Sequence, residues 1–161
     1  MIIDFKKIPK QGKVWVFPSS RKFYSQEIAV LKERIEDFLT DWDDQENSIN
    51  SSYLLKYDRF IIIAVDDITH SLSLQAHDLL IAFIQELEKI FEIVLMDKIN
   101  VCYKQGEFVQ YKDIKDFKKM IKTKGVSQKT IVFNNIISTK SELNQNWEIN
   151  IMDSWLGHFL K

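Results

Sequence analysis

Two polar segments of the sequence contain the side chains best suited to binding or catalysis. Each directly follows an apolar run, 14–17 or 60–65, that is typical of a buried strand. Cations beside hydroxyls favour an anionic ligand, because both groups donate hydrogen bonds to oxyanions. If the fold brings the segments together, they form a candidate ligand site with these residues: Ser19, Ser20, Arg21 and Lys22 in the first, and Asp66, Asp67 and His70 in the second.

The same residues also have a purely structural interpretation. Arg21 could pair with Asp66 or Asp67, and Ser25 and Ser73 could cap the helices that follow the two segments. Helix caps and surface ion pairs are common in proteins and require no ligand. Both interpretations stay open, and the structural one is the simpler.

Other kinds of site find little support in the sequence. A metal would need ligands such as Asp66, His70 and His77 to converge, and their spacing matches no metal-binding motif. The single cysteine, Cys102, lies in an expected strand with no histidine or acid beside it, as is typical of an inert buried thiol. The chain has neither a Gly-x-Ser-x-Gly motif nor a phosphate-binding loop, and its 4 glycines cannot build a nucleotide cradle. We therefore expect no metal, no cofactor, no catalytic residues and no ATPase activity.

The hydrophobic pattern predicts the elements that must position these segments. Apolar residues recur at helical spacing in some regions and alternate or run continuously in others. Trp147 and Trp155 in the C-terminal tail are expected to anchor it to the body. The expected strands are 14–17, 53–57, 60–65, 99–104, 108–111 and 130–133, and the expected helices are 28–42, a helix of about five turns that contains 79–90, 113–123, and a short turn at 139–142.

The first 104 residues follow the order β-α-β-β-α-β, which is the split βαβ order of ferredoxin-like folds. We therefore predict a single α+β domain over residues 1–161, with a ferredoxin-like core to which a hairpin, a helix, a strand and a tail are added. Strands 14–17 and 60–65 are continuously apolar, so we expect them to be central and parallel. Their polar ends would then be neighbours at the carboxyl edge of the sheet, where ligands bind in open α/β sheets.

Both faces of these two strands are apolar, so the second face of the sheet needs a cover. We expect either the last stretch of about 50 residues or a second copy of the chain to lie over it.

Composition and charge argue against nucleic-acid and membrane partners. The 161 residues contain 22 Lys and Arg against 23 Asp and Glu, so no net field attracts an anionic polymer. The longest apolar runs have six residues, far below the roughly 20 that span a bilayer. A lone cysteine and an N-terminus without an apolar signal segment predict a cytoplasmic location. Acids concentrate in 27–46 and lysines in 112–129. This pattern indicates solvated helix faces or, as a more specific alternative, docking surfaces.

Several segments carry a resemblance to a known family: 14–23 (VWVFPSSRKF), 59–62 (RFII), 133–135 (FNN) with 139–142 (TKSE), and 154–155 (SW). Through them nearly the whole chain resembles a small family of uncharacterised bacterial proteins whose members often carry the automated label ABC transporter ATPase. The resemblance implies neither a known activity nor catalytic residues, and the chain has no phosphate-binding loop to support the label.

These observations lead to two expected functions of different classes. The first is a non-enzymatic cytoplasmic module that self-associates as a homo-oligomer or binds a protein partner, without membrane or nucleic acid. The alternative is a small-molecule or anion-binding protein, or a weak enzyme, that uses loops 18–22 and 66–71.

Overall fold

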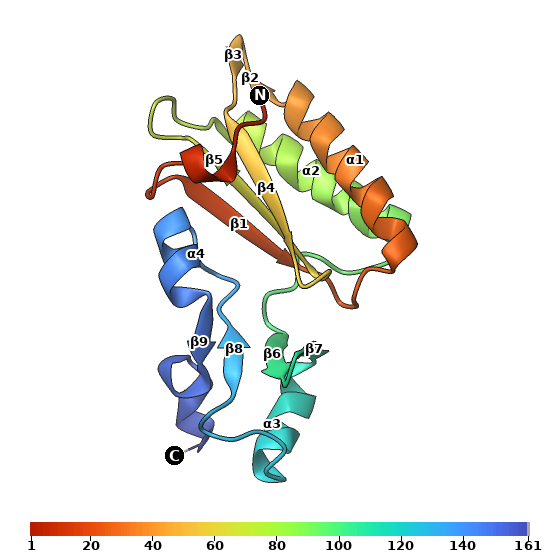
Figure 1. Ribbon diagram of the computed structural model, residues 1–161, viewed down its shortest axis with the longest axis vertical. Coiled ribbons are helices and arrows are strands. Elements are labelled where there is room, and N and C mark those ends of the chain that lie inside the picture. The colour runs from red at the N-terminus through yellow and green to blue at the C-terminus, as the bar shows by residue number, and fades with distance from the viewer. Residues whose placement is uncertain (161) are drawn as a thin grey trace.

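The computed structural model describes residues 1–160, and Figure 1 shows two lobes stacked along the long axis of the molecule. The N-terminal lobe is formed by residues 1–93, the C-terminal lobe by 101–160, and residues 94–100 connect them. Helices and antiparallel sheets occur together, so the α+β class expected from the sequence is confirmed.

The helices and strands have the following bounds. The α-helices are α1 (Ser25–Asp41), α2 (Leu74–Phe91), α3 (Ile114–Lys122) and α4 (Lys140–Asn146), and the short 3-10 helices are η1 (Phe5–Lys7), η2 (Ile151–Asp153) and η3 (Gly157–Leu160). The strands are β1 (Lys13–Pro18), β2 (Asp43–Asp44), β3 (Asn47–Ser48), β4 (Ser51–Lys56), β5 (Phe60–Val65), β6 (Val101–Gln105), β7 (Phe108–Lys112), β8 (Ile131–Phe133) and β9 (Glu148–Asn150).

The N-terminal lobe is built on a three-stranded antiparallel sheet in the order β1-β5-β4. The central strand, β5, pairs with β1 along its whole length and with β4 on its other side. A tight turn joins β4 to β5, in which the Arg59 N–H donates to the Lys56 carbonyl (3.0 Å). The expected split β-α-β unit is therefore present, with β5 inserted between β1 and β4.

Two expectations that accompanied the ferredoxin-like prediction are wrong, and the first, parallel central strands, was not required by the split β-α-β order. β1 and β5 are antiparallel rather than parallel, and β6, the fourth strand of the expected core, belongs to the sheet of the C-terminal lobe. The first error has a simple cause: α1 carries the chain back along the sheet, so β4 runs in the direction of β1 and the hairpin then reverses β5. The second arises because the 94–100 connection leads the chain away from the sheet (Figure 1).

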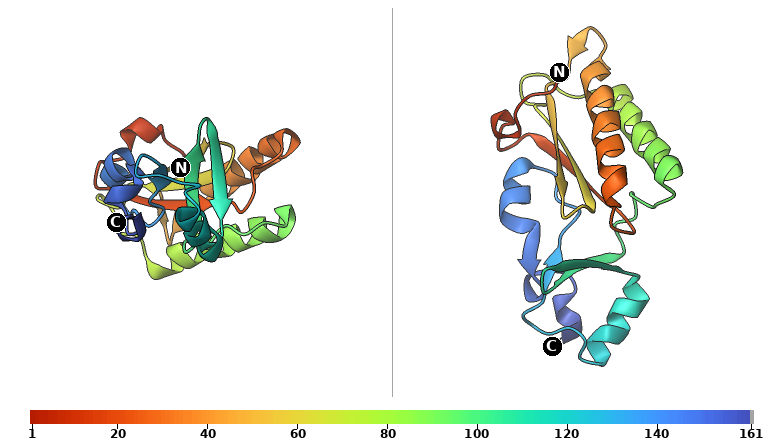
Figure 2. Two further views of the ribbon diagram at one scale, coloured as in Figure 1. Left: turned by 90° about the horizontal axis from the view of Figure 1, so that it is seen from below. Right: turned by 45° about the vertical axis from the view of Figure 1, so that its right-hand side comes forward.

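One face of this sheet packs against α1 and α2, which lie side by side in the right-hand view of Figure 2. The strands contribute Trp15, Phe17, Ile61 and Ile63 to the core on this face. Both helices follow from apolar residues repeated every three or four positions, which gather on one side of a helix. The buried stripes are Leu31, Ile35 and Leu39 on α1, and Ala76, Leu80, Ile84, Leu87 and Phe91 on α2.

The second face of the sheet is covered by the chain itself, which was one of the two expected alternatives. Val16, Phe60 and Ile62 point to this face and are each 0% exposed. They pack against Phe133 and Trp147 of the C-terminal lobe, whose ring centroids lie 4.8 and 5.0 Å from that of Phe60. The two lobes therefore share an apolar cluster, and no second copy is needed to cover this face.

Polar contacts fasten the lobes around that cluster. The Tyr57 hydroxyl donates to Glu148 Oε1 (2.8 Å), and Lys104 pairs with the same carboxylate. Lys140 Nζ donates to the backbone carbonyls of Phe5 (2.9 Å) and Ile8 (2.8 Å), which ties α4 to the N-terminal segment.

The C-terminal lobe contains a four-stranded antiparallel sheet in the order β7-β6-β8-β9. The expected hairpin of β6 and β7 is confirmed, and its turn holds Gly106 at a φ of 62°, which glycine adopts without strain. α3 packs Phe117 against Tyr103 in a separate small core, with ring centroids 5.3 Å apart. Within residues 1–160, no helix combines the length and the apolar character that crossing a membrane requires.

Truncation of Trp147 tests the joint between the lobes. Trp147→Ala removes a ring that is 4% exposed and contacts both lobes, so we expect the free energy of unfolding to fall by about 3–5 kcal/mol in urea denaturation. Trp155→Ala is the control, because the Trp155 side chain is 55% exposed and its loss should cost less than about 1 kcal/mol. Equal losses for the two variants would contradict the covered sheet face.

Candidate functional site

The two predicted loops, 18–22 and 66–71, lie at opposite ends of β1. Lys13 opens the strand and its N–H donates to Asp67 Oδ1 (3.2 Å), whereas Ser19 directly follows the last strand residue. The 6 residues of β1 put the loops roughly 20 Å apart, at about 3.3 Å per residue. The cations of the first loop therefore do not face the carboxylates of the second, and the expected meeting of these loops is wrong. Its cause is the antiparallel pairing of β1 with β5.

The polar side chains of loop 66–71 contact nearby residues of the chain. Asp66 Oδ1 accepts hydrogen bonds from the backbone N–H groups two and three residues later (3.1 and 3.4 Å). His70 Nε2 lies 3.7 Å from Asp44 Oδ2, and hydrogen bonds from Ser73 lower the pKa of that carboxyl. Ser73 Oγ also accepts from the N–H three residues later (3.1 Å), so it caps α2 as expected.

The serines of the first loop are also engaged. The buried Ser19 hydroxyl donates to the Arg21 carbonyl (2.5 Å), and Ser20 Oγ accepts from the Val94 N–H (3.0 Å) in the connection between the lobes. Lys22 is exposed, and its side chain makes no ion pair or hydrogen bond within residues 1–160. These residues therefore build a loop end rather than a ligand cradle.

Arg21 is a structural clasp, with partners other than those expected. Its Nη1 and Nη2 atoms donate to the two carboxylate oxygens of Glu27 (2.8 and 3.0 Å), and Nη2 also donates to the Phe91 carbonyl at the end of α2 (2.8 Å). Glu27 accepts in turn from the Tyr24 N–H (2.8 Å), so Tyr24, rather than Ser25, is the N-cap residue of α1. Their shared hydrogen bonds lower the pKa of Glu27 and raise the pKa of Arg21.

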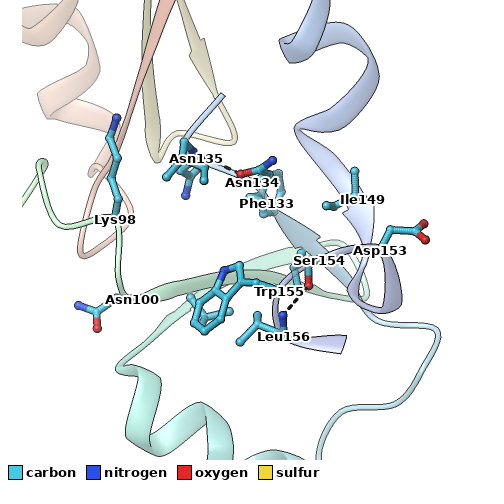
Figure 3. A pocket seen from close by; sticks show the side chains of 13 residues that line it. Lys98, Asn100, Phe133, Asn134, Asn135, Ile149, Asp153, Ser154, Trp155 and Leu156 are labelled. Carbon is cyan, nitrogen blue, oxygen red and sulfur yellow. Dashed lines mark hydrogen bonds between the residues drawn. The ribbon is translucent and has the colours of Figure 1, made fainter. Parts of the chain in front are cut away.

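A pocket in the C-terminal lobe, beside the joint, is the stronger candidate site. Figure 3 shows Lys98 and Asn100 on one side of it, Asn134 and Asn135 above it, and Trp155 below it. We call this cavity the Lys98 pocket. Its volume of about 220 Å³ lies below the roughly 300–1,000 Å³ of drug-sized sites, so it fits a small ligand. Val101, Val132, Phe133, Ile149 and Leu156 form the apolar part of its lining, which we call the apolar floor.

The polar groups left uncommitted around this pocket are several N–H donors and one carboxylate, that of Asp153, which makes no ion pair or hydrogen bond within residues 1–160. In the described part of the chain, Lys98 Nζ and Trp155 Nε1 donate to no protein acceptor, and the Asn134 amide is used only through Oδ1, which accepts from a backbone N–H (3.4 Å). By contrast, Asn100 Nδ2 donates to Asp97 Oδ2 (2.8 Å). Free donors beside apolar side chains favour a ligand that has oxygen acceptors and an apolar part, and Asp153 adds one acceptor to the same lining.

Two cations at the joint have no carboxylate within 4.0 Å among residues 1–160. Lys98 is partly buried with Nζ 5.9 Å from the centroid of the Phe17 ring, and burial lowers its pKa. Arg59 is 9% exposed and donates to the Ser19 carbonyl (3.1 Å), and burial lowers its pKa as well. Removing an unpaired cation from water is costly, so a bound anion would relieve part of that cost.

Cys102 lies in β6 under the joint and is buried. Burial raises the pKa of its thiol to about 12, so the sulfur is protonated at neutral pH and is a poor nucleophile. This agrees with the inert buried thiol expected from the sequence. Among residues 1–160, no three His, Cys, Asp or Glu side chains gather in a way that could hold a metal ion.

Comparisons with known proteins add no family or fold relative: no family model, no curated protein and no solved structure matches the chain. The resemblance to uncharacterised bacterial proteins therefore stays a prediction.

The Lys98 pocket could not be inferred from the order of residues, because it combines three separate segments, 98–101, 132–136 and 149–156. One available signal was misinterpreted. Trp147 does anchor the tail as expected, but Trp155, expected to do the same, is 55% exposed at the edge of the pocket. An indole left open to solvent beside asparagines is typical of a binding surface rather than a packing anchor.

The Arg21–Glu27 clasp predicts a pH-dependent stability. The pKa of Glu27 is lowered in the folded state, so its carboxylate stabilises the fold above its unfolded pKa of about 4.3, and that contribution is lost as the pH falls toward the folded value. Glu27→Gln should lower the free energy of unfolding by about 1 kcal/mol at pH 7. The gap from the unmodified protein should close in acid, as followed by urea denaturation between neutral and acidic pH. Glu33→Gln, at an exposed glutamate of α1, is the control; a Glu27→Gln gap that is constant with pH would rule out the clasp.

Proposed function

We propose that the protein binds a small organic anion in the Lys98 pocket. The observation that carries this proposal is the set of uncommitted N–H donors among the lining residues, together with Lys98, the only cation there, whose side chain extends from the pocket wall toward the end of β1; Asp153 is the one carboxylate in the lining. A carboxylate or phosphate near Lys98 would provide the acceptor that this amine lacks. The proposal keeps the anion-binding alternative expected from the sequence but moves it to other residues.

The lining of the pocket also restricts the rest of the ligand. The apolar floor is formed by aliphatic side chains and Phe133, and the half-exposed indole of Trp155 adds a flat surface to the lining. Such a lining suits a short aliphatic or aromatic group attached to the anionic head. Inorganic phosphate alone would leave that floor unfilled, so we expect it to bind more weakly than an organic anion of similar charge.

A partner-binding module, the leading expectation from the sequence, has weaker support. Its main basis was an uncovered sheet face, and the C-terminal lobe covers that face. What still favours it is exposed apolar surface: Ile136, which lines the pocket, and Ile99, between two lining residues in the sequence, are each 69% exposed. Self-association thus stays a prediction, which sedimentation velocity across a concentration series tests. The cytoplasmic location and the absence of nucleic-acid partners also stay predictions.

Thermal unfolding in the presence of simple anions tests the proposed function. The probes are benzoate, lactate and 2-oxobutanoate, with inorganic phosphate as the purely ionic comparison. A ligand present at about ten times its Kd should add roughly 1.4 kcal/mol, which corresponds to about 3–6 °C in Tm for a chain of this size. At least one organic anion should raise Tm in a saturable manner.

Matched lysine variants make this test specific. Lys98→Met removes the amine but keeps most of the side-chain length, so it should abolish the rise in Tm. Lys13→Met is the control, because Lys13 Nζ also lies over an aromatic ring, 5.1 Å from the Trp15 centroid, at the far end of β1. A rise in Tm that survives Lys98→Met, or the absence of any saturable rise, would refute binding in this pocket.

A further inference from the structure

We propose that copies of this chain associate head to tail, with Phe108 of one copy seated in a groove between α1 and α2 of the next. The residues involved lie outside the Lys98 pocket, so the inference stands or falls independently of the proposed function. It assigns contact surfaces to the self-association that the sequence led us to expect.

The groove lies between the two long helices of the N-terminal lobe and has a volume of about 420 Å³. Its apolar base is a stacked pair of rings: Phe38 of α1 and Phe83 of α2 are nearly parallel, with centroids 4.3 Å apart. Leu79, about one helical turn before Phe83, lines the same groove and is 48% exposed. The groove thus offers an apolar contact area to an incoming aromatic ring. We call it the α1–α2 groove.

α2 carries more apolar side chains than the core of the lobe uses. Residues 79–84 are six consecutive apolar residues, but only Leu80 and Ile84 of this run are fully buried. A helix with one face in the core normally has a polar opposite face. The rest of the run leaves apolar side chains on the solvent side of α2, which is typical of a surface that meets a partner.

The charged residues that line the α1–α2 groove are mostly acidic. Asp37, Asp41 and Glu86 line it against one cation, Arg34, and none of the four makes an ion pair or side-chain hydrogen bond within residues 1–160. The three from α1 lie at positions 34, 37 and 41, a spacing that puts them on one face of the helix. An apolar base with net negative charge around it favours an aromatic group that has cations beside it.

The C-terminal lobe has a surface of the opposite character. Phe108 begins β7, the edge strand of the four-stranded sheet, and is 68% exposed. The register of β6 and β7 places Phe108 on the same face of the sheet as Tyr103, against which α3 packs. Residues 107–129, which include both elements, contain 7 lysines against three acids, and none of these lysines has a carboxylate within 4.0 Å in residues 1–160. An exposed ring on the face of a basic helix therefore matches the groove in shape and in charge.

The two surfaces belong to different lobes of an elongated molecule, so they do not meet within one copy (Figure 1). Each copy offers one groove and one Phe108, which is the condition for a heterologous contact. Such contacts add further copies until a ring closes, so association does not stop at a dimer. Because part of the attraction is between exposed charges, salt should weaken it.

Sedimentation velocity across a concentration series tests the inference. At low ionic strength, the weight-average mass of the unmodified protein should rise with concentration to more than about twice the monomer mass. High salt should return it to the monomer mass. A protein that stays monomeric at low ionic strength, or associates equally well in high salt, would overturn the proposal.

Two variants each block one surface. Phe108→Ser removes the inserted ring, and the double variant Asp37→Asn with Glu86→Gln removes two carboxylates of the groove, so each alone should associate at least about tenfold more weakly. An equimolar mixture should form a dimer and nothing larger, because it contains one intact groove and one intact Phe108. If both variants keep the Tm of the unmodified protein and their mixture stays monomeric, these surfaces do not meet.

Glu33→Gln with Glu46→Gln is the matched control for the groove variant. Both glutamates are exposed acids of the N-terminal lobe outside the groove, so the control makes the same change in net charge. It should associate as the unmodified protein does. Equal weakening by the control and by the groove variant would reduce the effect to net charge and would overturn the groove as the contact surface.

Discussion

The fold depends on the burial of one strand, β5. All six of its side chains, from Phe60 to Val65, are 0% exposed, so it needs apolar neighbours on both faces as well as strands on both edges. β1 and β4 occupy the edges, and α1 and α2 supply one face. The other face has to come from the C-terminal lobe, because a three-stranded sheet with an open apolar face would associate or aggregate.

The candidate site is a consequence of that cover. Residues 94–100 must lead the chain off the end of the sheet, and β8 and α4 must return beneath it, so three distant segments meet at the joint. There the packing encloses Arg59 and partly encloses Lys98 without supplying an acid to either. Natural proteins tolerate local costs of this kind most often at functional sites. This is the physical basis for placing ligand binding at the joint rather than along the sheet edge.

The sequence predicted individual elements better than their relative directions. Runs such as 60–65, the β6–β7 hairpin and the α2 stripe depend on neighbouring residues, and the structure has them close to the expected positions. The direction of β5 relative to β1 could have been predicted too, by counting chain reversals through α1 and the hairpin. The site could not, because Lys98, Asn134 and Trp155 meet only through packing between segments. Likewise, Arg21 pairs with Glu27, six residues away. By charge alone, Asp66 and Asp67 were equally suitable partners.

Native-state hydrogen exchange tests most directly whether the two lobes fold as one unit around β5. Amides of β5 lie at the centre of the N-terminal sheet and those of β6 and β8 in the C-terminal sheet, and the shared cluster of Phe60, Phe133 and Trp147 links them. If that cluster is the main joint, the best-protected amides of both sheets should exchange through one global opening, with equal free energies and equal dependence on denaturant. If the β6 and β8 amides exchange through an opening of lower free energy while the β5 amides keep their full protection, β5 does not require the C-terminal lobe as its cover.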